Sequence, residues 1–170
     1  MGKIAVLVED QYQVLEVWYP YLRLKEEAIE VVLVGTGKSN YESKEGYPAK
    51  QDISIKDIDF SDFDGVIIPG GYAPDILRRY REINDFVGDM SRQGKLVAAI
   101  CHGGWVLASA NVLRGRKATS FSAIKDDVVN AGAQFLDQEV VVDKNLITSR
   151  NPYDLPAFCV EIIKFLKGGS

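Results

Sequence analysis

Four short apolar runs, rich in β-branched residues, constrain the fold of this chain most strongly. They are residues 4–8, 31–34, 65–68 and 96–100, and none of them contains a charged residue. Uninterrupted apolar runs of this length are typical of strands that are covered on both faces in a parallel sheet. We therefore predict that these four segments form the core of a parallel sheet.

Amphipathic segments lie between the runs and predict the connecting helices. Residues 14–28 place apolar side chains at helical spacing and collect charges on the other face. Further helices are predicted over residues 83–93, 105–112 and 152–167, the last beginning at a proline and followed by Gly168-Gly169. Alternating strands and helices imply right-handed crossovers and an α/β class.

Two segments depart from this alternation. Residues 47–55 are interpreted as a small antiparallel excursion, and residues 138–149 as a hairpin that turns at residues 143–145. Both are expected to lie at the periphery. The 170 residues contain no repeat or linker, so residues 1–170 are predicted to form a single domain.

Composition excludes several classes of function. The net charge is −4 and basic residues are scattered among acidic ones, so we expect no nucleic-acid partner. No apolar run is long enough for a membrane span or a secretory leader, which favours a cytoplasmic protein without membrane contact. Two cysteines and one histidine are too few for a structural zinc site, and we expect no metal or organic cofactor.

Ligands of open α/β sheets bind beyond the carboxyl ends of the strands. Three loops follow the predicted strands there, and they span residues 9–13, 69–75 and 101–104. The third reads Cys-His-Gly-Gly between a strand and a helix, the order of a nucleophile elbow, and Gly103 and Gly104 suit the tight turn. We therefore predict that the three loops converge around the thiol of Cys101.

The local chemistry predicts a reactive thiol. A helix N-terminus next to Cys101 is expected to lower the pKa of its thiol. Backbone N–H groups of His102 and of Gly70 or Gly71 are placed to stabilise an oxyanion. His102 is the only histidine and so the only candidate imidazole base, provided that the turn folds its ring back.

A carboxylate must then orient the imidazole, and Asp75 is the candidate. Both residues also have a purely structural interpretation. A cysteine at the end of a core strand is usually inert, and a lone histidine is usually structural. The adjacency of Cys101 and His102 before two glycines favours the functional interpretation. For Cys159, which lies among apolar residues of the last predicted helix, core packing is favoured.

Several motifs together resemble a known family. The motifs are residues 18–20, 23–27, 68–75, 99–103, 112–117, 124–127, 130–132 and 139–143. With them the chain is similar to the PfpI intracellular-protease branch of the ThiJ/PfpI superfamily, which is related to class I glutamine amidotransferases. The resemblance implies a flavodoxin-like three-layer sandwich with a mostly parallel central sheet and a nucleophile elbow.

The resemblance also implies roles for particular residues. Cys101 is the expected nucleophile and His102 its partner, in a homo-oligomer whose active site lies near an interface. Asp75 is expected to reach His102 of another subunit. The pocket is expected to include Gly70, Gly71, Gly103 and Gln13.

The chain departs from the family pattern at three positions. Counting back from the Tyr-Pro pair puts Gln13 where the family has a glutamate that is hydrogen-bonded to the cysteine, and an amide cannot exchange a proton. Glu9, Asp10 and Glu16 are alternatives, but the gap-free spacing to Pro20 favours Gln13. Phe121 replaces a usual tyrosine, and Gly104 replaces a usual proline.

The resulting prediction is a cysteine-dependent enzyme that attacks a carbonyl or acyl carbon. Its substrate is a peptide or a small carbonyl compound, through peptidase or glyoxalase/deglycase action. The alternative is a non-enzymatic stress-response chaperone, or a redox sensor that works through oxidation of Cys101.

Overall fold

A seven-stranded sheet forms the centre of the computed structural model, which describes residues 2–168. Its strand order is β10-β11-β7-β6-β1-β2-β5, and every neighbouring pair is parallel except β10 and β11. Two small pairs lie outside it, β3 with β4 and β8 with β9. The strands are β1 (Lys3–Leu7), β2 (Val31–Gly35), β3 (Asn40–Glu42), β4 (Pro48–Lys50), β5 (Ile53–Ser54), β6 (Phe63–Ile68), β7 (Leu96–Ile100), β8 (Lys117–Ala118), β9 (Gln134–Phe135), β10 (Val141–Asp143) and β11 (Leu146–Ser149).

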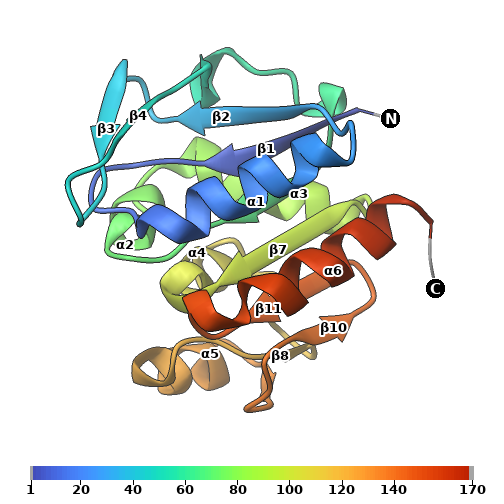
Figure 1. The fold of residues 1–170 in the computed structure, drawn as a ribbon. Helices are drawn as coiled ribbons and strands as arrows, with labels where there is room; N and C mark the ends of the chain where they lie inside the picture. The colour runs from blue at the N-terminus through green and yellow to red at the C-terminus, as the bar shows by residue number, and fades with distance from the viewer. Residues whose placement is uncertain (1, 169–170) are drawn as a thin grey trace.

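Helices cover both faces of the sheet, which gives three layers. Helices α1 and α6 lie together on the face towards the viewer in Figure 1, and α3 and α4 lie behind the sheet. The helices are α1 (Val14–Glu26), α2 (Ala73–Leu77), α3 (Arg81–Arg92), α4 (Gly104–Ser109), α5 (Lys125–Asn130) and α6 (Leu155–Leu166). This is the predicted flavodoxin-like sandwich with a mostly parallel sheet.

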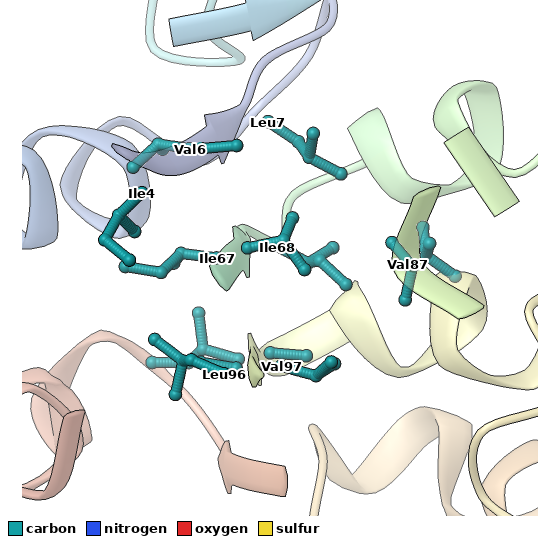
Figure 2. Close-up of a cluster of buried hydrophobic side chains, with 14 of the residues drawn as sticks. Ile4, Val6, Leu7, Ile67, Ile68, Val87, Leu96 and Val97 are labelled. Atoms are coloured by element: carbon teal, nitrogen blue, oxygen red, sulfur yellow. The ribbon is translucent and has the colours of Figure 1, made fainter. Parts of the chain in front are cut away.

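Alternating side chains of the central strands fill the core on both sides of the sheet. Figure 2 shows Ile67 and Leu96 directed to one side, and Ile68 and Val97 directed to the other, where they meet Val87 of α3. All five side chains are buried. Burial on both faces explains why these strands carry no charged residue in the apolar runs.

The four predicted core strands are confirmed as β1, β2, β6 and β7. Helices α1, α3, α4 and α6 are confirmed with shifted ends, while the short helices α2 and α5 were not predicted. Helix α4 ends at Ser109 because the chain turns at Asn111, whose φ is +59°. A helix of five or six residues shows too little periodicity to be recognised from sequence.

Two predictions about the periphery need correction. The antiparallel excursion begins at Asn40, and Ile53–Ser54 is not part of it, because β5 pairs in parallel with β2. The hairpin over residues 138–149 is confirmed, with Lys144 in its turn, but only its first strand, β10, lies at an edge of the main sheet. Strand β11 is fully buried and pairs with β7 inside the main sheet.

Candidate active site

Cys101 lies where β7 ends and the chain turns into α4. Ile100 is extended, whereas Cys101 has a φ of +61°. A non-glycine residue in this left-handed region costs about 1–3 kcal/mol, which the surrounding structure must offset. One restraint is the hydrogen bond that the N–H of Phe121 donates to the Cys101 carbonyl at 3.2 Å. The turn is the predicted nucleophile elbow, and the cysteine itself takes the strained conformation.

Close approach, rather than a positive φ, explains two glycines at the elbow. Gly103 has a φ of −56°, but a Cβ there would lie 2.7 Å from the carbonyl oxygen of Ile68. A Cβ on Gly70 would lie 2.5 Å from Oε1 of Glu16 and 2.7 Å from Cβ of Cys101. The glycines therefore let the elbow, the end of β6 and the start of α1 pack against one another.

A carboxyl group lies beside the thiol, and it belongs to Glu16. This residue is in the first turn of α1 and is 0% exposed. Its Oε1 accepts a hydrogen bond from the N–H of Gly70 at 2.8 Å, and the carboxyl group hydrogen-bonds with the thiol of Cys101. Among residues 2–168, no hydrogen-bond partner contacts Oε2. Because Oε2 is buried without a partner, the neutral, protonated form of the carboxyl group is favoured over the carboxylate.

The prediction that Gln13 takes the place of this carboxyl group is wrong. Gln13 is the N-cap of α1, and its side-chain oxygen accepts a hydrogen bond from the N–H of Glu16 at 2.9 Å. An N-cap side chain folds over the helix end, so the side chain three residues later is the one that enters the core here. Gln13 lines the pocket, but a proton-exchanging carboxyl group is present.

Glu16 and Cys101 compete for one proton. Burial raises the pKa of Glu16 to about 7, although the N–H of Gly70 and the charge of Lys44 oppose the rise. Burial, followed by the negative charge of Glu16, raises the pKa of the Cys101 thiol to about 12. The direction is opposite to the one predicted from the helix N-terminus, because burial outweighs the effect of so short a helix. When the proton sits on Glu16, the repulsion between the two groups is removed.

Two backbone N–H groups favour negative charge at the sulfur. Hydrogen bonds from the N–H groups of His102 and Gly71 both lower the pKa of Cys101 and so partly offset the rise in pKa that burial causes. They are the amides predicted from the sequence to surround the reacting atom. A neutral Glu16 would remove the negative charge that opposes ionisation of the thiol.

The imidazole of His102 is folded back towards the thiol. Its Nδ1 lies 3.2 Å from the Sγ of Cys101, within hydrogen-bonding range for sulfur. The ring stacks on Phe121 with a centroid distance of 5.0 Å and meets the edge of Trp105 at 5.0 Å. Burial lowers the pKa of His102, and the charge of Lys44 lowers it further. A neutral imidazole can accept the thiol proton.

Asp75 does not contribute to this cluster within one chain. It lies on α2, where its carboxylate forms an ion pair with Arg79, one turn further along. Within residues 2–168, no carboxylate is hydrogen-bonded to the imidazole of His102. The orientation of the ring comes from the two aromatic side chains described above.

A cavity of about 360 Å³ opens onto the thiol. Its wall is mainly aromatic and apolar, and each of the three predicted loops contributes residues to it. The lining residues are Gln13, Glu16, Lys44, Gly71, Tyr72, Cys101, His102, Trp105, Phe121, Asn151 and Pro152. The predicted convergence of the three loops at one edge of the sheet is therefore observed.

The sequence did not predict the contribution of Lys44. This residue lies between β3 and β4, and its N–H donates to the Tyr12 carbonyl at 3.0 Å, which fixes the hairpin beside the first loop. Lys44 brings the only ammonium group among the lining residues of the cavity in the described chain. Its charge lowers the pKa of the thiol as well as those of the carboxyl group and the imidazole.

Comparison with known proteins identifies the family. The model of the DJ-1/PfpI family matches residues 2–165.

The chain belongs to the DJ-1/PfpI family.

Two family members and one structure illustrate the similarity. "Deglycase PfpI" of Pyrococcus furiosus is 42% identical over 165 residues, which cover 97% of this chain and 99% of that protein. "Putative cysteine protease YraA" of Bacillus subtilis is 42% identical over 167 residues, which cover 97% and 98%. The crystal structure of a two-domain protein from Anabaena variabilis, with DJ-1/ThiJ/PfpI-like and ferritin-like domains, matches with a TM-score of 0.94 and 43% identity. The match covers 98% of this chain and 48% of that protein.

Other features of this DJ-1/PfpI chain concern cofactors and membranes. Within residues 2–168, no three His, Cys, Asp or Glu side chains are gathered where they could hold a metal ion. None of the helices in that range is long and apolar enough to span a bilayer.

Proposed function

We propose that this DJ-1/PfpI chain is a cysteine-dependent hydrolase or deglycase that acts on a carbonyl or acyl carbon. The observation that carries the proposal is the contact of 3.2 Å between Sγ of Cys101 and Nδ1 of His102, with the buried carboxyl group of Glu16 on the same sulfur. A thiol, a neutral imidazole and a buried acid are the groups that such chemistry needs.

The first step joins the sulfur to the carbonyl carbon. The proton of the Cys101 thiol passes to Nδ1 of His102, Sγ forms the C–S bond, and the carbonyl oxygen takes the electron pair of its π bond. The N–H groups of Gly71 and His102 point to this region and stabilise the oxyanion. The imidazolium then returns its proton to the oxygen or to the leaving group.

Glu16 sets the charge of the site. Its pKa of about 7 means that, near neutral pH, the carboxyl group is protonated in a large fraction of the molecules. A protonated Glu16 is neutral and leaves the Cys101 thiolate as the only negative charge of the pair. Gly70 positions this carboxyl group through the hydrogen bond from its N–H.

We infer that the chain works as a homo-oligomer with Asp75 near the active site of a neighbouring subunit. Helix α1 carries the exposed apolar side chains Leu15, Tyr19 and Leu22 at helical spacing, which suits a subunit contact. Asp75 lies on α2, and the adjoining loop residue Tyr72 is also exposed. A strictly monomeric mass in solution would remove Asp75 from the mechanism. A cytoplasmic location stays a prediction.

The experiment that tests the function measures turnover of a methylglyoxal–peptide adduct and of a fluorogenic peptide. The wild-type protein should turn over at least one of these two substrates. Cys101→Ser and His102→Ala should each abolish that turnover. Cys159→Ala is the matched control, because it removes the other buried thiol in α6. Unchanged rates in Cys101→Ser, or equal losses in the control, would contradict the proposal.

A further inference from the structure

A second cavity adjoins the one at the thiol. Its volume is about 470 Å³, and the two cavities share Phe121 and Asn151 as a common wall. The second cavity is lined by Ser120, Phe121, Ser122, Lys125, Phe135, Asp137, Arg150 and Asn151. None of its residues belongs to the catalytic groups described above. A substrate that reacts at the thiol can therefore extend across this wall.

The common wall is fixed relative to the nucleophile. The N–H of Phe121 donates to the carbonyl of Cys101, and its ring stacks on His102. The side-chain oxygen of Asn151 accepts a hydrogen bond from the N–H of Tyr153 at 3.0 Å. These contacts hold the common wall of the two cavities in one geometry, as expected for a preformed binding site.

The two cavities differ in chemistry. Tyr72, Trp105, Phe121 and Pro152 give the first one a largely apolar wall, which suits a short carbon chain next to the reacting carbonyl. The second cavity is lined mainly by hydroxyl, amide and charged side chains. A ligand that fills both must therefore have an apolar arm and a polar body.

Arg150 brings hydrogen-bond donors that the protein does not use. Its Nε and Nη2 donate to the buried carboxylate of Asp154 at 2.9 and 3.1 Å, and Nη1 donates to Asp137 at 3.0 Å. A guanidinium group has five N–H donors, so two remain for a ligand. The ion pairs hold the group in place and balance its charge, which leaves it suited to neutral acceptors such as amide carbonyls.

The remaining charges favour a ligand that carries both donors and acceptors. Lys125 packs over the ring of Phe135 at 5.5 Å, and Asp137 offers carboxylate oxygens at the other side of the cavity. With Arg150 and Asp154 included, the two cations are matched by two carboxylates. A phosphate would find no excess of positive charge here, whereas the alternating C=O and N–H groups of a peptide main chain can use both kinds of partner.

We propose that the second cavity binds the main chain of a peptide whose side chain carries the reacting carbonyl into the first cavity. The inference rests on the proposed function, and it makes the substrate a peptide-borne carbonyl group rather than a free small aldehyde. An apolar side-chain stem crosses Phe121 and Asn151, while the main chain of the peptide lies against Arg150, Lys125 and the serines.

Affinity labelling of Cys101 tests the inference without requiring turnover. The probe is a pentapeptide of alanines around a central lysine that is chloroacetylated on its side chain, and the comparison reagent is the same modified lysine capped at both ends. Sγ of Cys101 displaces chloride, so that a C–S bond forms, the C–Cl bond breaks, and the thiol proton leaves to solvent. Intact-mass spectra give the rate of labelling at Cys101.

At low concentration, the pentapeptide is expected to label the wild-type protein about tenfold faster than the capped lysine does. A tenfold ratio corresponds to about 1.4 kcal/mol of additional binding free energy. Ser122→Trp, which fills the second cavity, should remove this advantage and leave labelling by the capped lysine unchanged. Ala123→Trp is the matched control, since Ala123 is the exposed neighbour of Ser122 and does not line the cavity.

Equal labelling by the two reagents in the wild-type protein, or an advantage that survives Ser122→Trp, would overturn the inference. Faster labelling by a chloroacetylated aminoalkyl mononucleotide than by the pentapeptide would also overturn it and would identify a nucleotide site instead. Failure of the proposed function is seen separately, as absence of turnover in a protein that still shows the peptide advantage in labelling.

Discussion

The pH dependence of stability gives a sharp prediction about Glu16. Burial raises its pKa from 4.5 to about 7, so the folded state holds this proton over a range in which the unfolded chain has lost it. Below pH 4.5, Glu16 is protonated in both the folded and the unfolded state, so its ionisation does not lower the free energy of unfolding. Between pH 4.5 and about 7, the unfolded state gains from ionisation and the stability of the folded state falls. Above that range the loss is constant.

The magnitude follows from the two pKa values. Between pH 5 and pH 8, the ionisation of Glu16 should destabilise the wild-type protein by about 2.5 kcal/mol, because each unit of pKa difference is equivalent to 1.36 kcal/mol. Glu16→Gln keeps the shape of the side chain and removes the titration. The stability difference between wild type and this variant should therefore shift by about 2.5 kcal/mol in favour of the variant as the pH rises.

Urea unfolding followed by tryptophan fluorescence gives this difference at each pH, with equal m-values as the check on two-state behaviour. Glu82→Gln, at an exposed position of α3, controls for the loss of one carboxyl group. A shift of less than about 0.5 kcal/mol in Glu16→Gln would show that Glu16 titrates like a surface glutamate, and the account of its buried proton would be refuted.

Three further predictions concern the same site. Gly70→Ala places a Cβ 2.5 Å from Oε1 of Glu16, so we expect about 1–3 kcal/mol of destabilisation in urea and loss of turnover; wild-type values would contradict the packing described here. Lys44→Met removes a charge that lowers the pKa of His102, so the low-pH limb of kcat/KM should move to higher pH, and an unmoved limb would exclude the imidazole as base. Mild peroxide should oxidise Cys101, which is 8% exposed, before Cys159, which is 1% exposed. If peptide mass mapping finds Cys159 oxidised first, the thiol of Cys101 is not the more accessible of the two.

The sequence predicted the fold well where local pattern and tertiary role agree. The run Leu96–Ile100 is buried on both faces, so its composition alone indicates a central parallel strand. The segment Leu146–Ser149 is equally buried, but it is short and ends in Thr-Ser, which resembles an outer hairpin. Its pairing with β7 is a contact between distant segments, which local composition does not encode.

The site was predicted in part for a similar reason. Cys101 and His102 lie together on one turn, so their sequence already brings them close. The spacing to Pro20 selects Gln13, whereas the folded helix start makes Gln13 the N-cap and turns the side chain three residues later, Glu16, towards the thiol. Lys44 arrives from a separate hairpin, and only the folded chain places it at the cavity.

Cys101 is expected to form a covalent bond with the carbonyl substrate. Rapid mixing with a methylglyoxal–peptide adduct, acid quenching and intact-mass spectrometry measure this directly. We expect a transient mass increase that peptide mapping places on Cys101, in the wild type and in Cys159→Ala but not in Cys101→Ser. Turnover without any adduct on Cys101, or an adduct that persists in Cys101→Ser, would contradict it.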